Sequence, residues 1–146
     1  MGRALDVGLS EADGALSPDS IVVVSEELPF VELTLAAWRV GADYVVVVSG
    51  GAAHVGCAVL AVPRPSLKGD ETASSTASTL NVCGHKDDVV CRAVAERVCA
   101  AMNARVACTG GVHVDGISVG QITQISDAFE RMASRLIEKL MCLSCQ

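Results

Sequence analysis

Three histidines are the side chains in this sequence best suited to metal binding or proton transfer at neutral pH. They are His54, His85 and His113, and each is expected in a turn or at the edge of a strand. Their spacing lacks the H-x-x-H and H-E-x-x-H arrangements that direct two imidazoles toward one metal ion. A hydrogen-bonded structural role is therefore the simpler interpretation for each, and we predict no metal site. A zinc site that adds Cys83 beside His85 stays as an alternative.

The remaining polar residues do not compose a catalytic triad or a carboxylate pair. No cysteine stands at a helix start beside an obvious base, where its thiolate would be activated. Asp87 and Asp88 open a predicted helix, and negative charge is favourable there because of the helix dipole. Helix capping is a sufficient role for both acids. We therefore predict a protein that is not an enzyme.

Anion binding is the chemistry that other residues favour. Arg64 and Ser66 fall in a polar loop, and His85 and Lys86 precede a predicted helix whose free amides attract phosphate. Asp87 and its neighbour oppose a phosphate at that helix, and solvated Ser/Thr-rich loops are common. Further cationic or hydroxyl side chains of the loop region are Lys68, Ser74, Ser75 and Thr76.

Composition and charge exclude several classes of protein. The chain has 146 residues, of which 51% are apolar and only 3% aromatic, enough for one compact domain with an aliphatic core. Its net charge of -6 argues against binding to nucleic acid, which requires clustered Lys and Arg. No stretch approaches the roughly 20 apolar residues of a transmembrane helix. The first residues carry acids where a secretory signal is apolar, so we expect a cytoplasmic protein without membrane contact.

Seven cysteines are present, an odd number that favours reduced thiols over a disulfide framework. Four of them lie inside apolar patterns, where cysteine behaves as a small hydrophobic residue. Cys142 and Cys145 form a C-x-x-C pair that we place in a tail over residues 142–146. The four cysteines predicted in the core are Cys57, Cys91, Cys99 and Cys108.

Hydrophobic periodicity predicts a single domain over residues 20–141, after a flexible arm over residues 1–19. Strands are expected at residues 20–28, where one edge strand fits, and then at 30–35, 44–51, 54–63, 75–83 and 104–114. The connection at residues 49–53 is short and contains Gly50-Gly51, which predicts an antiparallel hairpin between the strands that flank it. No helix follows these glycines, so a phosphate-binding loop is not indicated.

Two helices complete the predicted domain. The first spans about residues 86–102. The second follows Ser118, which together with Gln121 fits a capping box, and its apolar stripe requires a sheet to cover. That stripe comprises Ile122, Ile125, Phe129, Met132, Leu136 and Leu140.

The order of these elements predicts an α+β fold. The first strands are joined without helices, which argues against a parallel Rossmann-like sheet. We expect a mainly antiparallel sheet of five or six strands with two α-helices packed on it. Because one face of such a sheet would stay open, a homodimer is a natural way to complete the core.

Three segments carry a family resemblance: SGGAAHVGCAVLAVPRPS, GHKDDVVCRAVAERVC and ACTGGVHVDGISVGQITQI. Over about residues 28–140 the chain resembles the bacterial prenylated flavin chaperone-like proteins, typified by the small accessory protein of gallate decarboxylase. That family is similar in fold to proteasome assembly chaperones three and four.

The resemblance implies a non-catalytic accessory protein that helps a prenylated-FMN-dependent decarboxylase to acquire or mature its cofactor. A flavin prenyltransferase makes that cofactor, so both enzymes are expected partners. The family segments fall at residues 50–54, 64–66, 84–88 and 111–115. Within them, the side chains suited to transient binding of prenylated FMN or FMN are Arg64, Ser66, His85 and Lys86 for the phosphate and His54 for the edge of the ring.

Two other functions stay open at this point. The chain could be a pure assembly module, with a sheet and helices that form only protein interfaces. It could also be a small enzyme or metal-binding protein that uses the three histidines and Cys83.

Overall fold

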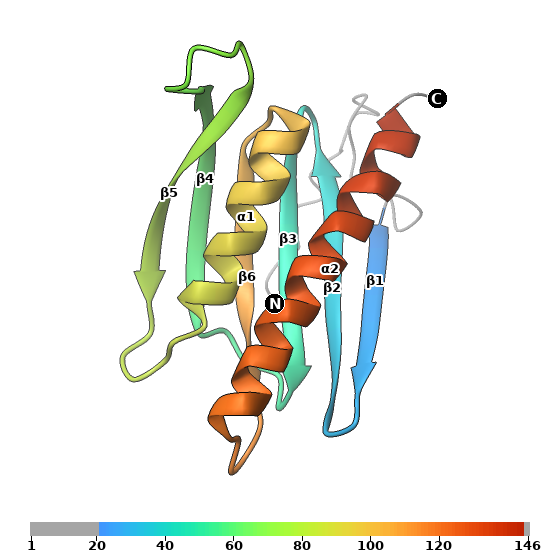
Figure 1. The fold of residues 1–146 in the computed structure, drawn as a ribbon, viewed down its shortest axis with the longest axis vertical. Coiled ribbons are helices and arrows are strands. Elements are labelled where there is room, and N and C mark those ends of the chain that lie inside the picture. Colours follow the sequence, from blue (N-terminus) through green and yellow to red (C-terminus); the bar gives the residue numbers. More distant parts are fainter. Residues whose placement is uncertain (1–20, 145–146) are drawn as a thin grey trace, which may run out of the picture.

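The computed structural model describes residues 21–144, so the arm expected over residues 1–19 lies outside the described residues. Within these described residues, six strands and two helices follow one another (Figure 1). The elements are β1 (Ile21–Leu28), β2 (Val31–Val40), β3 (Asp43–Gly51), β4 (Cys57–Pro65), β5 (Ala73–Asn81), α1 (Asp88–Met102), β6 (Val106–His113) and α2 (Val119–Ser144).

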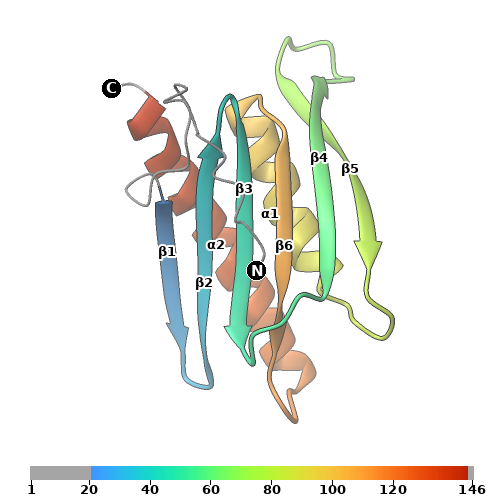
Figure 2. The ribbon, with the colours of Figure 1, turned by 180° about the vertical axis from the view of Figure 1, so that it is seen from behind.

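The strands form one mixed sheet in the order β1-β2-β3-β6-β4-β5 (Figure 2). Every neighbouring pair is antiparallel except β3 and β6, which are parallel from Tyr44 opposite Val106 to Gly51 opposite His113. The α+β fold with a mainly antiparallel sheet is therefore confirmed.

The predicted hairpin between β3 and β4 is wrong, because β6 lies between these two strands. The connection at residues 52–56 must cross two strand spacings, about 10 Å, and five residues span that distance easily. A short glycine-rich connection thus fits a hairpin of adjacent strands and also fits two strands with a third between them. The difference depends on β6, which comes later in the sequence.

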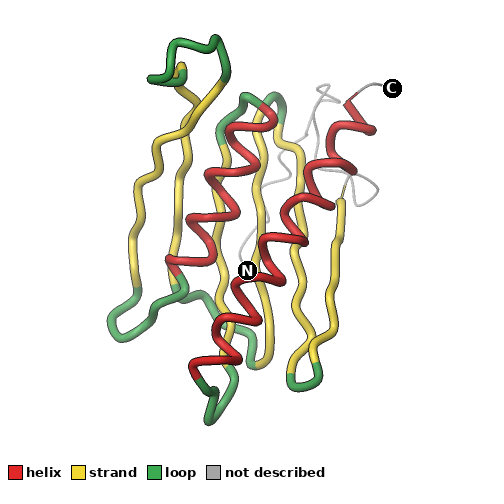
Figure 3. Tube along the Cα trace, in the orientation of Figure 1, coloured by secondary structure: helices red, strands yellow, loops and turns green. Residues whose placement is uncertain are grey.

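Both helices cover the same face of the sheet (Figures 1 and 3). Alternate residues of each strand point toward them, so Leu35 of β2 lies opposite Val48 of β3 and both side chains are almost completely buried. The core contains no large cluster of aromatic rings and is built from aliphatic side chains and thiols, as the composition predicts. Its largest fully buried side chains are Leu33, Leu35, Met132, Leu136, Val46, Val48, Val94, Val98 and Val106.

The predicted capping box begins α2. The backbone N–H of Gln121 donates to Ser118 Oγ at 3.2 Å, and the N–H of Ser118 donates to Gln121 Oε1 at 2.9 Å. The predicted apolar stripe is buried, apart from Ile122, because the first turn of α2 projects beyond the end of the sheet (Figure 1). The helix continues to Ser144, so Cys142 belongs to it, and Cys145 lies outside the described residues.

The four cysteines predicted in the core are buried and unpaired. Burial and the neighbouring Cys91 raise the pKa of the Cys57 thiol to about 12, and the contact with Cys108 together with burial raises the pKa of Cys91. Burial also raises the pKa of Cys99. Cys57, Cys91 and Cys99 therefore stay protonated at neutral pH, and all four side chains act as packing groups.

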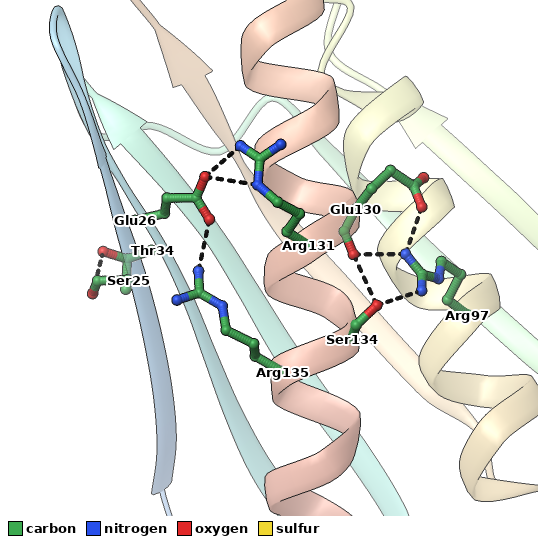
Figure 4. Close-up of polar contacts among 8 residues, drawn as sticks. All are labelled: Ser25, Glu26, Thr34, Arg97, Glu130, Arg131, Ser134 and Arg135. Carbon is green, nitrogen blue, oxygen red and sulfur yellow. Dashed lines mark hydrogen bonds and ion pairs between the residues drawn. The ribbon is translucent and has the colours of Figure 1, made fainter.

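Charged groups attach the helices to the sheet and to each other (Figure 4). Glu26 of β1 points toward α2, and its carboxylate accepts hydrogen bonds from Arg131 and from Arg135, the latter at 2.8 Å. Arg97 of α1 donates to the side chain and the backbone carbonyl of Glu130 on α2. An inward charge on an edge strand also discourages pairing with another sheet.

The opposite face of the sheet is covered by no element among residues 21–144 (Figure 2). Apolar side chains lie along it on both halves of the sheet, and several are strongly exposed. They include Val23, Leu60, Val62 and Leu80, with exposed fractions of 48%, 49%, 42% and 78%. We call the outward-facing residues of the six strands the open face.

Replacing Glu26 tests the attachment of β1 to α2. Only 19% of its side chain is exposed, so Glu26→Ala leaves two guanidinium groups without their acceptor and should lower the free energy of unfolding by about 1–2 kcal/mol. Glu96→Ala is the matched control, because the exposed Arg92–Glu96 pair within α1 contributes at most about 0.5 kcal/mol. Equal effects of the two substitutions in urea denaturation would contradict this account.

Candidate functional site

The carboxyl ends of β3 and β6 meet at one edge of the sheet, because these strands are parallel. This is the kind of position at which ligands bind in sheets with parallel strands. His54 follows β3, His113 ends β6, and α1 begins beside them after a loop that carries His85. Residues from three separate parts of the chain therefore lie close together here.

Asp87 is the centre of this group. Its Oδ2 lies 3.0 Å from His54 Nε2 and 3.3 Å from His85 Nδ1, and its Oδ1 accepts the backbone N–H of Val112 at 2.9 Å. The imidazole rings of His54 and His85 have centroids 4.9 Å apart. We call His54, His85 and Asp87 the histidine–aspartate cluster.

The predicted capping role of Asp87 is wrong for its side chain. Asp87 stands at the N-cap of α1, but its carboxylate makes no capping hydrogen bond. It turns toward β6 and the histidines, because the amide of Val112 and the two imidazoles offer it stronger partners. Only its backbone carbonyl serves the helix, by accepting the N–H of Cys91.

Two glycines make room for this arrangement. A Cβ on Gly56 would lie 1.9 Å from Asp87 Oδ2, and a Cβ on Gly111 would lie 2.5 Å from His54 Nε2. Neither distance is sterically allowed, so both positions require glycine as long as the two side chains stay in place. The close approach of side chains to backbone shows that the cluster is tightly built.

The surroundings favour an ionised pair in the cluster. The carbonyl of Ala52 and the carboxylate of Asp87 raise the pKa of His54. Burial works to raise the pKa of Asp87, but the Val112 amide and the two histidines outweigh it, so the pKa is lowered. At a mildly acidic pH, which lies above the pKa of Asp87 and below the pKa of His54, His54 is a cation and Asp87 is an anion.

The five residues predicted to bind a cofactor divide into two groups. His54 and His85 belong to the cluster, and the exposed Lys86 stands between His85 and Asp87 in sequence. Arg64 and Ser66 lie at the other end of β4, about 23 Å from the cluster for seven extended residues. One phosphate group therefore cannot contact both groups.

Arg64 and Ser66 line an open hollow of about 460 Å³ at the β4–β5 turn. The guanidinium of Arg64 donates from Nε to Thr76 Oγ1 at 2.9 Å and from Nη1 to the carbonyl of Pro65 at 3.1 Å. These bonds fix the side chain and leave other N–H groups free to donate to a ligand. The remaining lining residues are Pro63, Pro65, Gly69, Glu71, Thr72, Ala73 and Asn103.

A prediction from sequence that no serine is flanked as G-x-S-x-G is wrong, because residues 116–120 have this pattern. In hydrolases this pattern raises a serine nucleophile at a strand-to-helix turn beside a histidine. Here Ser118 lies in the turn between β6 and α2, and its hydroxyl accepts the N–H of Gln121. The pattern therefore serves as the helix cap.

The role of Asp87 is what the prediction from sequence missed. An aspartate before a helix is ordinarily a cap, and the parallel pairing that brings Val112 and His54 to it joins residues far apart in sequence. The available signals were Gly56, directly before β4, and Gly111 inside β6, since glycine in or beside a strand often marks close approach of another group.

Residues 29–141 match the family model of the prenylated flavin chaperone LpdD-like domain. The chain belongs to this family. The match extends from the β1–β2 turn almost to the end of α2 and so includes both the histidine–aspartate cluster and the hollow at Arg64. The family resemblance seen in the sequence is confirmed. Among curated proteins, no sequence matches the chain.

The fold is also similar to that of a solved chain from a chaperone complex for yeast 20S proteasome assembly. The TM-score is 0.51 at 14% sequence identity, and the alignment covers 82% of this chain and 97% of the yeast complex's chain. At this identity the likeness shows a shared fold. In addition, neither helix among residues 21–144 is long and apolar enough to cross a membrane.

Adding a methyl group at Gly111 tests the packing of the cluster. Gly111→Ala should displace His54 and Asp87, lower the free energy of unfolding by about 1–3 kcal/mol and shift the imidazole NMR signals of His54 and His85. Gly120→Ala is the control, because a Cβ there meets only Ser118 Oγ at 3.9 Å and alanine favours a helix. Unchanged imidazole signals in Gly111→Ala would show that the cluster is not packed in this way.

Proposed function

We propose that this chain is a non-catalytic accessory protein of the cytoplasm that assists a prenylated-FMN-dependent decarboxylase of the gallate type. It would receive prenylated FMN or FMN transiently and help the decarboxylase to acquire or mature its cofactor. The observation that carries the proposal is membership of the prenylated flavin chaperone family over residues 29–141. The described cysteines are unpaired, which fits a reducing compartment.

The hollow at Arg64 is the better of the two places for a flavin phosphate. Its volume falls in the range of small-molecule sites, and the fixed guanidinium of Arg64 can donate to phosphate oxygens. Glu71 is the one acid among its lining residues. At the start of α1, by contrast, Asp87 and Asp88 both repel a phosphate near Lys86.

The open face supports a homodimer. Exposed apolar side chains on a soluble protein commonly mark interaction surfaces, and the open face carries them on β1, β4 and β5. Six strands of about nine residues, side by side across five strand spacings, give a projected area of about 700 Å², close to the roughly 800 Å² that each partner buries in a standard interface. A second copy would place the same apolar side chains against one another.

A second candidate function is favoured by the same open face. An assembly module without a cofactor would use the sheet and the helices only as protein interfaces, with the decarboxylase or the flavin prenyltransferase as its partner. Flavin binding separates the two functions, because only the cofactor chaperone requires it.

Charge reversal at Arg64 tests the cofactor proposal. Arg64→Glu should weaken binding of FMN and of prenylated FMN by about 10- to 100-fold, the effect expected for loss of a charged hydrogen bond. Thermal unfolding should change little, since Arg64 bonds only to surface groups. Titration followed by flavin fluorescence, with transfer to an apo decarboxylase followed by its activity, measures both steps.

Two matched charge reversals accompany this test. Arg39→Glu removes another exposed arginine that donates to a nearby carbonyl, and it should leave flavin binding unchanged. Lys86→Glu should also leave flavin binding unchanged. If Lys86→Glu weakened flavin binding and Arg64→Glu did not, the phosphate would bind at the start of α1 and not in the hollow at Arg64. A wild-type chain that binds neither flavin would contradict the chaperone proposal and leave the assembly module.

Charge insertion tests the dimer. Leu60→Glu places a carboxylate in the open face and should convert the dimer to a monomer in light scattering. Leu67→Glu makes the same change at a side chain that is 90% exposed in the β4–β5 turn. This control should leave the molar mass measured by light scattering at that of the dimer. A wild-type monomer at tens of micromolar would refute the dimer.

A further inference from the structure

Three donor atoms converge in the histidine–aspartate cluster. His54, His85 and Asp87 each offer one ligand atom, and these atoms all lie within 4.8 Å of one another. His54 Nε2 and His85 Nδ1 lie 3.0 and 3.3 Å from the same carboxylate oxygen, Oδ2. Donor atoms about 3.3 Å apart are typical of tetrahedral sites with bonds of about 2.0–2.1 Å.

The contacts of His54 place an acceptor against each ring nitrogen, so a neutral imidazole cannot donate to both. Its Nδ1 lies 3.0 Å from the carbonyl oxygen of Ala52, and its Nε2 lies 3.0 Å from Asp87 Oδ2. Both neighbours are acceptors, whereas a neutral imidazole carries only one N–H. If Nδ1–H donates to the carbonyl of Ala52, the lone pair of Nε2 faces the carboxylate of Asp87. Either a second proton on Nε2 or a metal ion between Nε2 and the carboxylate removes this repulsion.

The surrounding backbone holds the donors in the way that metal sites require. An imidazole whose other nitrogen donates to a backbone carbonyl is the usual arrangement for a histidine that binds metal. Asp87 Oδ1 is occupied by the N–H of Val112, so Oδ2 is the oxygen directed at the histidines. Gly56 and Gly111 bring the backbone against Asp87 and His54 and restrict their movement.

We propose that His54, His85 and Asp87 form a binding site for a divalent transition-metal ion of the zinc class. Two imidazoles and one carboxylate suit such ions, whereas magnesium and calcium prefer oxygen donors alone. The Nδ1 of His85 completes the set of three donors. That side chain is 37% exposed, so the ion can enter from solvent and keep a fourth position for water.

His113 is not one of the three ligands. Its ring stands edge-on to that of His54, with centroids 6.1 Å apart, and its Nε2 lies 3.1 Å from Asp115 Oδ1. Cys83 also lies outside the group of converging donors. The site thus differs from the alternative raised from the sequence, which used three histidines and Cys83. Here Asp87 is a ligand, and His113 and Cys83 are not.

Zinc titration of the full chain tests the proposal. After treatment with a chelator, the protein should bind one zinc ion per chain in competition with a chromophoric chelator, without any flavin present. His85→Ala removes a partly exposed ligand and should weaken zinc binding at least tenfold, and Asp87→Asn should do so as well. Circular dichroism of His85→Ala should match the wild type, which keeps the test valid if Asp87→Asn fails to fold.

Two substitutions serve as controls against other donors. His113→Ala and Cys83→Ser remove nearby ligand-type side chains outside the site and should leave the affinity unchanged. Cobalt bound in place of zinc should show d–d bands without thiolate charge-transfer absorption. Absence of stoichiometric zinc binding, equal binding by His85→Ala, or loss of binding in Cys83→Ser would overturn the proposal. None of these results depends on the flavin experiments.

Discussion

The parallel pairing of β3 with β6 is the constraint on which the rest of the structure depends. It requires glycine at one point, because Gly110 has φ of +121° and a Cβ there would lie 1.9 Å from the carbonyl oxygen of Val48. It joins the β1–β2–β3 half of the sheet to the β4–β5 half. It also directs two carboxyl ends to one edge, and the histidine–aspartate cluster is a direct consequence.

Local elements could be predicted from the sequence because their causes are local. The alternation along β2, the capping box at Ser118 and the apolar stripe of α2 each depend on neighbouring residues, and the structure contains all three. The insertion of β6 could not be predicted in the same way. Turn chemistry at residues 49–53 fits a hairpin, and the competing strand begins more than 50 residues later.

The residues of the candidate site likewise divide into those that local sequence identifies and those that depend on the tertiary fold. His54 and His85 can be singled out by residue type, and the structure brings them together. Arg64 and Ser66 share a suitable chemistry with them, but β4 separates the two groups along its length. Asp87 resembles a cap in the sequence because its other partners, Val112 and His54, come from strand ends that only the tertiary fold brings to it.

The late position of β6 in the chain also has a consequence for folding. The β1–β3 meander and the β4–β5 hairpin are both local, but they stay unconnected until the chain has passed through α1 and formed β6. Such non-local pairing slows folding. During synthesis, the Val-rich edge of β3 therefore remains unpaired until some 50 further residues have been added. An unpaired strand edge promotes aggregation. The formation of β6 then covers two strand edges at once, that of β3 and that of β4.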